Sequence, residues 1–425
     1  PKIWRQSGAI EELSTEEVDG VRVVPNAPFG RIFLNSLWIP DPTQPGRLLK
    51  SNTGDPTDFL NGDAAAYDLD LGDGDPFGIT SIYPPFFGAL YISKRYSIYK
   101  LSPVFLPDGD LVFSIAKIVD GVGCIAHNAV VAAESMIFFP SDRGVHYLTS
   151  TNMLSTVTTS YLSKDIQPVW YDETNFNRAQ YMQAVYDIEL NSYILIFPRQ
   201  GRNYPTDVWG YSIPTNKWFR WREYGQTSIN RYVDFNNKRI RTMVGSSEGN
   251  FGYMDTSVHK DYGKPFGLYV ESGIIAPGDP DLRYQFKAVA PIFVPQLSGE
   301  FNFTYKVNGR KIETLNFKLT SDELGDLIGE DFVTGISVLG GLPRVKMEKR
   351  RTEGSGNFYS ILIEHTPMPS DEFDEDFELL GILIEVEEIN KKDPNQLWVG
   401  ERLMYGYLPM LGVHTFNGVA FTPDL

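Results

Sequence analysis

The chain has 425 residues, of which 42% are hydrophobic, so it is long enough for two or three domains with real cores, and wholesale disorder is excluded. Its net charge of −16 excludes nucleic-acid binding driven by overall charge, and its single cysteine, Cys124, excludes an internal disulfide framework. Aromatic residues make up 13% of the chain beside 38 Gly and 28 Pro, which favours short strands joined by tight turns. No apolar run reaches the ~20 residues that cross a bilayer, so we expect no membrane-spanning segment.

The first part of the chain repeats one local theme, in which an apolar strand, a turn and a second aromatic strand follow one another. The repeats begin near residues 31, 88, 134, 190 and 237. A spacing of roughly 45–55 residues is typical of one four-stranded propeller blade. We therefore expect an all-β chain with a β-propeller of five or six blades over residues 1–262. The segment VRVVPNAP is expected to add a closing strand to the last blade.

Three tryptophans, Trp209, Trp218 and Trp221, lie on short strands around the predicted hairpin turn at Thr215–Asn216. Large flat rings on such strands suit the packing of one blade against the next. The same rings could stack on carbohydrate, which keeps a sugar-binding function open. Packing is the favoured role, because strand aromatics are mostly buried.

Beyond residue 262 the blade-length repeat ends, and residues 263–400 read as an antiparallel β-sandwich. The segment GEFNFTYKVNGRKIETLNFKL predicts a long hairpin with a type I′ turn at Asn308–Gly309. Alternation predicts that four apolar side chains share one face of its first strand. These side chains are Phe301, Phe303, Tyr305 and Val307. The apolar segment 401–425 is expected to pack on a neighbouring domain or subunit.

The run DLDLGDGDP is the feature of the sequence that most resembles a metal site. Its carboxylates belong to Asp68, Asp70, Asp73 and Asp75. A calcium-binding loop of the EF-hand type needs oxygen ligands at alternate positions and a closing Glu. Here Gly72 stands where a ligand should be, and no Glu closes the loop. We predict a solvated acidic turn between blades, and a bound divalent ion remains the alternative.

Cys124 and His127 lie three residues apart in GVGCIAHNAVVAA. A cysteine–histidine nucleophile also needs an orienting third group, which the sequence does not supply. Cys124 is therefore predicted to be a buried small hydrophobe. The five histidines are scattered, and no phosphate-loop, zinc-protease, serine-hydrolase or paired CxxC motif occurs. We expect no catalytic, cofactor-binding or metal-binding residue, no cofactor, and a protein that is not an enzyme.

Two charged runs mark the second half of the chain. SDEFDEDFELLGILIEVEEI carries nine carboxylates, and its residues Glu385 and Glu387 alternate with Ile384 and Val386. This alternation predicts a solvent-facing strand side rather than the paired acids of a glycosidase. A salt-sensitive contact with a basic partner surface is a further expectation. The basic run, Arg344, Lys346, Lys349, Arg350 and Arg351, is predicted to be a solvated loop, with DNA contact as the alternative.

Three segments within residues 30–150 resemble a known family. They are RIFLNSLWIPDPTQPGRLLKSNTGDPTDF, LGDGDPFGITSIYPPFFGALYISKRYSIYKL and VGCIAHNAVVAAESMIFFPSDRGVHYL. In this order they look like the propeller of bacteriophage tail hub, nozzle and head-to-tail stabilisation proteins. RYQFKAVAPIFVPQLSGEFNFTYKVNGRK and FELLGILIEVEE resemble the sandwich half of the same proteins. The motifs consist of turns and strands and carry no catalytic residue.

The resemblance implies a structural component of a phage virion, at the tail or the head-to-tail junction. It implies a homo-oligomeric ring, often a hexamer, around the DNA exit channel, with other tail, portal or adaptor proteins as partners. The acidic charge would let viral DNA pass through the channel without specific binding. The alternative function is a glycan-binding or glycan-cleaving propeller module for host recognition, and a cellular scaffold propeller is a third class.

Overall fold

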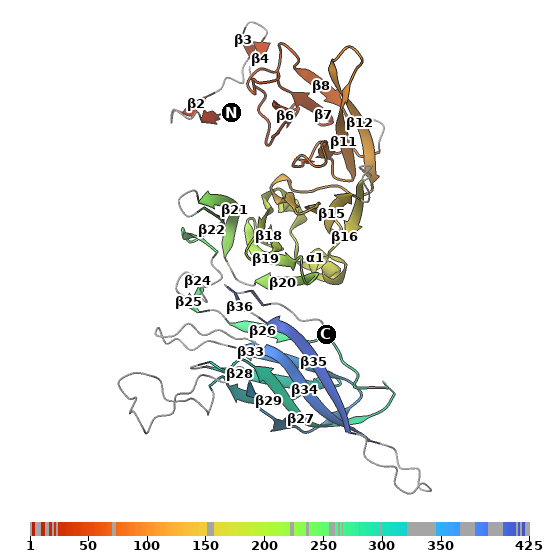
Figure 1. The fold of residues 1–425 in the computed structure, drawn as a ribbon, viewed down its shortest axis with the longest axis vertical. Coiled ribbons are helices and arrows are strands. Elements are labelled where there is room, and N and C mark those ends of the chain that lie inside the picture. Colours follow the sequence, from red (N-terminus) through yellow and green to blue (C-terminus); the bar gives the residue numbers. More distant parts are fainter. Residues whose placement is uncertain are drawn as a thin grey trace, which may run out of the picture. The chain divides into compact units, whose positions relative to one another are not determined.

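The computed structural model describes residues 24–320 and 346–389, apart from residues 70–73, 151–156, 222–224, 235–237, 255–266, 280, 297–298 and 366–378; elsewhere it describes only the backbone of short strands. Strands dominate this part of the chain (Figure 1). Its helical segments are α1 (Gln167–Glu173) and three short 3-10 turns, η1 (His127–Ala129), η2 (Lys164–Ile166) and η3 (Phe176–Tyr181). The all-β class is confirmed. None of the helices described has the length and hydropathy that a bilayer span requires.

The chain divides into two compact units, each of which is described by itself. The first contains residues 1–209 and 225–253, and the second contains residues 210–224 and 254–425. The first unit holds small sheets that follow one another along the chain, except that residues 210–224, which include the last strand of the fourth small sheet, belong to the second unit. The second holds two larger sheets around one core.

Five small antiparallel sheets follow one another between residues 31 and 253, and in each one successive strands are neighbours. The first sheet comprises β5 (Arg31–Phe33), β6 (Ser36–Pro40), β7 (Arg47–Lys50) and β8 (Ala65–Asp68). The second comprises β9 (Ser81–Ile82), β10 (Leu90–Ser93), β11 (Ser97–Phe105) and β12 (Leu111–Asp120). The third comprises β13 (Val131–Ala133), β14 (Met136–Ser141), β15 (Gly144–Ser150) and β16 (Val157–Tyr161). The fourth comprises β17 (Gln183–Asp187), β18 (Ser192–Pro198), β19 (Pro205–Ser212) and β20 (Lys217–Trp221), and the fifth comprises β21 (Gln226–Asp234), β22 (Arg239–Ser246) and β23 (Phe251–Tyr253).

The starts of these sheets differ from the predicted repeat starts. The first sheet begins at residue 31 as expected, but the next four begin at residues 81, 131, 183 and 226 instead of 88, 134, 190 and 237. The predicted positions mark the second strand of each later sheet. Second strands such as β10 and β18 are buried along their whole length, so they form clear apolar runs. First strands such as β9, with two residues, carry little pattern.

The backbone of the N-terminal segment forms two short hairpins. β1 (Lys2–Trp4) pairs with β2 (Ile10–Glu12), and β3 (Glu17–Val18) pairs with β4 (Val21–Arg22). The predicted closing strand included Val21 and Arg22, which pair with β3 here. The closing role remains a prediction for the rest of VRVVPNAP.

Apolar clusters join neighbouring sheets of the first unit. One cluster combines Trp38 and Leu48 of the first sheet with Ile92 and Leu101 of the second. Another combines Tyr91 of the second sheet with Ile137, Phe139 and Leu148 of the third, and Cys124 lies in it. The first three sheets therefore bury faces against one another, as small sheets must do to be stable.

The second unit contains two antiparallel sheets that enclose one hydrophobic core, as in a β-sandwich. One sheet has the order β26 (Leu268–Glu271), β33 (Tyr359–His365), β28 (Glu300–Val307), β29 (Arg310–Lys318). The other has the order β30 (Lys346–Met347), β27 (Tyr284–Phe293), β34 (Leu379–Glu388), β35 (Leu403–Val413), and β31 (Arg350–Arg351) and β32 (Ser355–Gly356) also pair with β27. Short hairpins lie at β24 (Lys260–Asp261) with β25 (Lys264–Pro265), and at β36 (Thr415–Phe416) with β37 (Val419–Ala420). The side chains of residues 401–425 lie outside the described residues, so their packing stays a prediction.

The hairpin of β28 and β29 forms as the sequence predicts. Phe301, Phe303, Tyr305 and Val307 are all at least 96% buried. Asn308 and Gly309 have φ of 49° and 77°, the left-handed values that a type I′ turn requires. The hairpin thereby contributes four apolar side chains to the shared core.

Candidate functional site

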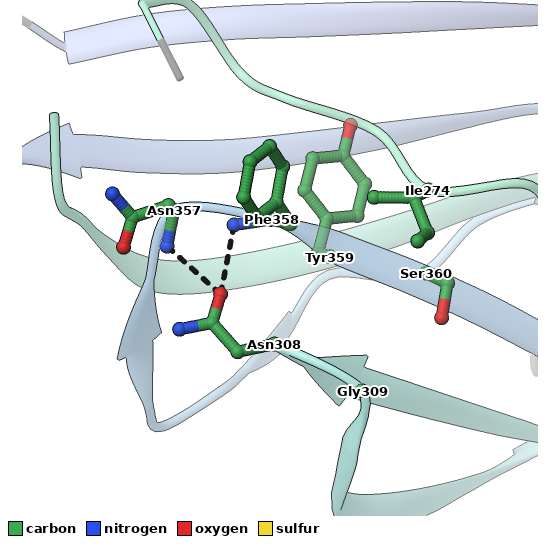
Figure 2. A pocket seen from close by; sticks show the side chains of 7 residues that line it. All are labelled: Ile274, Asn308, Gly309, Asn357, Phe358, Tyr359 and Ser360. Carbon is green, nitrogen blue, oxygen red and sulfur yellow. Dashed lines mark hydrogen bonds between the residues drawn. The ribbon is translucent and has the colours of Figure 1, made fainter. Parts of the chain in front are cut away.

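A pocket of about 460 Å³ lies in the second unit, beside the turn between β28 and β29 (Figure 2). Asn308 organises it, because its Oδ1 atom accepts hydrogen bonds from the backbone N–H groups of Asn357 (3.1 Å) and Phe358 (3.0 Å). The other residues that line the pocket are Ile274, Gly309, Tyr359 and Ser360. The sequence predicted the Asn308–Gly309 turn but not the pocket, because Asn357, on the other side of the pocket, is 49 residues from Asn308 in the chain.

The lining of this pocket suits binding rather than proton transfer. Its only titratable group is Tyr359, and burial raises the pKa of that phenol to about 12. Ile274 is 80% exposed and Phe358 is 38% exposed, so apolar surface is offered beside amide and hydroxyl groups. Such a pocket can hold a small apolar group or a side chain of another protein.

A buried lysine in the first unit, at the end of β7, pairs with a carboxylate that is 56% exposed. Lys50 is 3% exposed, and its Nζ donates to Asp63 Oδ2 (2.8 Å) and to the carbonyl oxygens of Asp63 and Ser51. Burial would raise the pKa of Asp63, but hydrogen bonds from Lys50 and Thr53 hold it well below its usual range. Each charge is saturated by local partners, so the pair fixes the 51–63 loop rather than offering a free nucleophile or base.

Asp68 and Asp75 are the two carboxylates of the acidic run that lie within the described residues, and each has a structural partner. Asp68 forms an ion pair with Arg47 at 2.8 Å. Asp75 is 8% exposed, and its Oδ2 accepts hydrogen bonds from the backbone N–H of Tyr96 (2.8 Å) and the hydroxyl of Ser97 (3.0 Å). Asp70 and Asp73 lie outside the described residues. Among the residues that are described, no group of three His, Cys, Asp or Glu could hold a metal ion.

Cys124 and His127 both interact with Ser81 and are otherwise bonded to different groups. The Cys124 Sγ contacts the Ala126 carbonyl at 3.2 Å, and burial raises the pKa of the thiol to about 12. His127 stacks on Phe29, and its Nδ1 lies 3.3 Å from the Ser81 hydroxyl. Burial lowers the pKa of His127 to about 4. A thiol and an imidazole with these pKa values are both neutral at pH 7, so they do not form a reactive thiolate–imidazolium pair. Cys124 is completely buried, as predicted.

Charged residues of both runs in the second unit form ion pairs, one of which joins the two runs. Glu385 pairs with Lys349, and Glu387 pairs with Lys287 at 2.5 Å. Ile384 and Val386 are both 3% exposed, so the predicted alternation along β34 is confirmed. In the basic run, Lys346 and Arg350 both pair with Glu348. Arg344 and the carboxylates at 371–378 lie outside the described residues.

The three tryptophans chosen from the sequence are packing residues. Trp209, Trp218 and Trp221 are 8%, 7% and 2% exposed. Their rings are therefore not available to a sugar. One exposed aromatic pair that the sequence did not indicate is Tyr181 and Tyr204, which are 39% and 63% exposed with ring centroids 5.8 Å apart.

The tip of the β11–β12 hairpin is an apolar surface in solvent. Phe105 is 75% exposed, and its apolar neighbours Val104, Leu106, Leu111 and Val112 are each 39–41% exposed. The turn between the strands carries Asp108 and Asp110. We call residues 104–112 the hairpin tip. The sequence does not predict this exposure, because apolar residues beside a turn usually belong to a strand core.

The comparisons with known proteins match one segment of the chain in sequence and find solved structures that are similar at low TM-scores. A family described as "Domain of unknown function (DUF7654)" matches residues 381–425. No curated protein matches the chain.

Solved structures similar to the chain include enzymes that act on polysaccharides. An exo-β-1,3-galactanase from Phanerochaete chrysosporium, solved with galactose, is 12% identical with a TM-score of 0.23, over 84% of this chain and 81% of the galactanase. A glycoside hydrolase family 43 arabinoxylan arabinofuranohydrolase from Bacillus subtilis is 8% identical with a TM-score of 0.21, over 96% and 78% of the two chains. The extracellular domain of a putative hybrid two-component system from B. thetaiotaomicron is 9% identical with a TM-score of 0.20, over 95% and 61%.

These comparisons contradict one expectation from the sequence, namely that the chain is not an enzyme. The similar structures include glycoside hydrolases, and we withdraw that prediction. At these identities and TM-scores, no catalytic residue can be transferred to this chain.

Proposed function

We propose that the protein is a structural subunit of a bacteriophage particle, in the tail hub, nozzle or head-to-tail stabilisation class, and forms part of a ring around the DNA exit channel. The hairpin tip is the observation that carries this proposal. The family resemblance of residues 30–150 supplies the class of particle. Other tail, portal or adaptor proteins are the partners that this class implies.

The hairpin tip supports a role in assembly because its exposure is unfavourable for a free subunit. Phe105 is 75% exposed at the end of two strands of nine and ten residues. Burying a large apolar side chain stabilises a contact by about 1.5–3 kcal/mol. A contiguous exposed patch of this kind marks a protein interface more often than a solitary exposed side chain does.

The five small sheets support a propeller of five blades within this proposal. Successive strands are neighbours in every sheet, and the first four sheets have four strands each. Blades that pack side by side resist deformation, because each is held by its neighbours. The net charge of −16 would then keep DNA from adhering to a channel lined by such subunits.

Size and location together test this function. We expect purified protein to sediment as an oligomer, and an antibody against it to label intact virions at the tail or its junction with the head. A Phe105→Ser variant should keep its melting temperature but sediment as a smaller species, and Phe87→Ser, at a side chain 54% exposed in another loop, is the matched control. A monomer that is absent from particles would refute the proposal.

The second candidate is a glycan-binding or glycan-cleaving module, which the exposed pair Tyr181–Tyr204 supports. Tilted aromatic rings in solvent offer apolar faces on which a sugar ring can stack. The galactanase and the arabinofuranohydrolase named above belong to this functional class. Glycan-array binding that is lost in Tyr204→Ala, or release of reducing ends from host polysaccharide, would favour it. The absence of both signals at millimolar ligand would eliminate this second candidate.

A further inference from the structure

The fifth sheet presents an aromatic face that nothing in the described chain covers. The strand register places Tyr232, Arg241, Met243, Phe251 and Tyr253 on the same face. Tyr232, Phe251 and Tyr253 are 51%, 74% and 47% exposed. The opposite face holds side chains that are at least 94% buried, namely Ile229, Thr242 and Val244. One face of this sheet thus belongs to the core, and the other, which we call the aromatic face, is open.

The aromatic face lies in a locally basic segment of an acidic chain. Residues 226–253 contain four basic residues, Arg231, Lys238, Arg239 and Arg241, against two acidic ones, Asp234 and Glu248. The guanidinium of Arg241 lies 3.9 Å from the centroid of the Tyr253 ring. Lys238 and Arg239 are exposed and form no ion pair with a described carboxylate, whereas the register places Arg231, opposite Thr242, on the other face. A partner of this face would therefore combine apolar groups with negative charge.

The hairpin tip has that combination. Between Leu101 and Ala116 the only charged residues are Asp108 and Asp110, and the flanking side chains are apolar. Asp108 Oδ1 accepts a hydrogen bond from the backbone N–H of Asp110 (3.2 Å), which sets both carboxylates at the end of the hairpin. Both the tip and the aromatic face are exposed within one chain, so the tip does not fill the face of its own subunit.

We propose that the hairpin tip of one copy docks on the aromatic face of a second copy, with Phe105 against Phe251 and Tyr253, and with Asp108 and Asp110 toward Lys238 and Arg239. The two surfaces differ, so the contact is heterologous, and it forms the ring of the proposed function when the rotation from copy to copy closes. This inference rests on the proposed assembly function and names the surfaces that make the contact. The evidence for the contact is the exposure of the aromatic rings on both surfaces and the opposite charges beside them.

Directed cross-linking tests the contact. Cys124 is completely buried and its pKa is raised to about 12, so introduced cysteines are the reactive ones. Phe105→Cys and Phe251→Cys proteins are prepared separately, mixed and oxidised mildly. We expect a disulfide-linked dimer in the mixture and not in either protein alone. Phe105→Cys mixed with Tyr204→Cys, a side chain 63% exposed elsewhere, is the matched control and should give no dimer.

A charge exchange provides the second measurement, which needs no cysteine. Asp108→Lys with Asp110→Lys should weaken self-association about tenfold at low salt, as sedimentation reports it. Lys238→Glu with Arg239→Glu in the same chain should restore association, because the sign of both surfaces is reversed. All four positions are on the surface, so an unchanged melting temperature confirms that each variant folds.

The outcomes separate this contact from the assembly function. If the protein forms oligomers or labels virions but gives no mixed dimer, or does not recover association after charge exchange, the proposed contact is wrong and the assembly function is unaffected. A monomer at every concentration that is also absent from virions would overturn both. A chain carrying both cysteines that closes an internal disulfide would show that the tip fills its own subunit's face, and this result would also refute the proposal.

Discussion

The guanidinium of Arg95 lies against the carboxylate of Asp142, with Nε 2.7 Å from Oδ2 and Nη2 2.8 Å from Oδ1. Arg95 is in the turn between β10 and β11, and Asp142 is in the turn between β14 and β15. The pair therefore joins the second sheet to the third. Hydrogen bonding to Asp142 raises the pKa of Arg95, and the guanidinium also lies 5.2 Å from the centroid of Phe77. The forked geometry and partial burial make this pair a specific link between the two sheets.

Replacing Arg95 by Lys should lower the free energy of unfolding by about 1 kcal/mol, because an ammonium cannot make the two parallel hydrogen bonds or stack on Phe77 in the same way. Chemical denaturation of Arg95→Lys, Asp142→Asn and the double variant would measure the coupling between the two groups. Arg47 and Asp68 pair within one sheet at 31% and 51% exposure, and the same cycle there should give a smaller coupling. Equal coupling for the two pairs would contradict the role of Arg95 between sheets.

Asp75 should be a structural anchor and not a metal ligand. Asp75→Ala leaves the N–H of Tyr96 and the hydroxyl of Ser97 without this acceptor in a buried site, which should cost about 2 kcal/mol. Asp75→Asn keeps one acceptor oxygen and should cost less. Thermal unfolding with and without millimolar calcium should give the same melting temperature for the natural chain. A calcium-dependent rise that Asp75→Ala abolishes would revive the metal site.

Gly123 should tolerate no side chain. A Cβ there would lie 2.1 Å from the carbonyl oxygen of Lys94, and backbone cannot move aside as a flexible side chain can. Gly123→Ala should destabilise the first unit by about 3 kcal/mol in chemical denaturation. Gly273→Ala is the matched control, because a Cβ at that position meets nothing within 4 Å. If both variants were equally stable, the close approach of the 121–124 loop to the β10–β11 turn would be wrong.

The sequence predicted features that depend on local pattern. Alternation gave the buried face of β28, and the Asn308–Gly309 pair gave its turn, because side-chain period and positive φ are properties of a few adjacent residues. It placed the second strands of the small sheets better than the first, because first strands such as β9 and β13 are too short to carry a period. The strand content and the spacing of the sheets could therefore be predicted from the sequence, whereas the boundaries of the sheets could not.

The candidate sites depend on contacts between distant residues, which the sequence does not display. Lys50 meets Asp63, and Asn308 meets Asn357, only after the loops between them have folded back. The sequence also does not show which apolar side chains are exposed. Phe105 and Phe303 both lie in apolar strands, yet Phe105 is 75% exposed and Phe303 is fully buried. A hydrophobic pattern predicts which residues can be buried, and packing decides which ones are.

His146 should make the first unit sensitive to acid. Its ring is 6% exposed and stacks on Tyr161 with centroids 4.9 Å apart. Burial, helped by the charge of Arg143, lowers its pKa to about 4 from the ordinary value of 6.5. Above pH 6.5 the imidazole is neutral in both the folded and the unfolded chain, so the full stability is present.

Between pH 6.5 and pH 4 the unfolded chain gains a proton on His146 that the folded chain does not, so the free energy of unfolding falls as the pH falls. The loss for this one group should reach about 3 kcal/mol at pH 4 and then level off. His146→Phe keeps a stacked ring and removes the proton, so its stability should fall less than that of the natural chain over the same interval. Other groups, His127 included, are present in both proteins and cancel in the difference. If urea denaturation of the two proteins gave parallel curves from pH 7 to pH 4, His146 would have to be protonated in the folded state, and the dry, stacked position of its ring would be wrong.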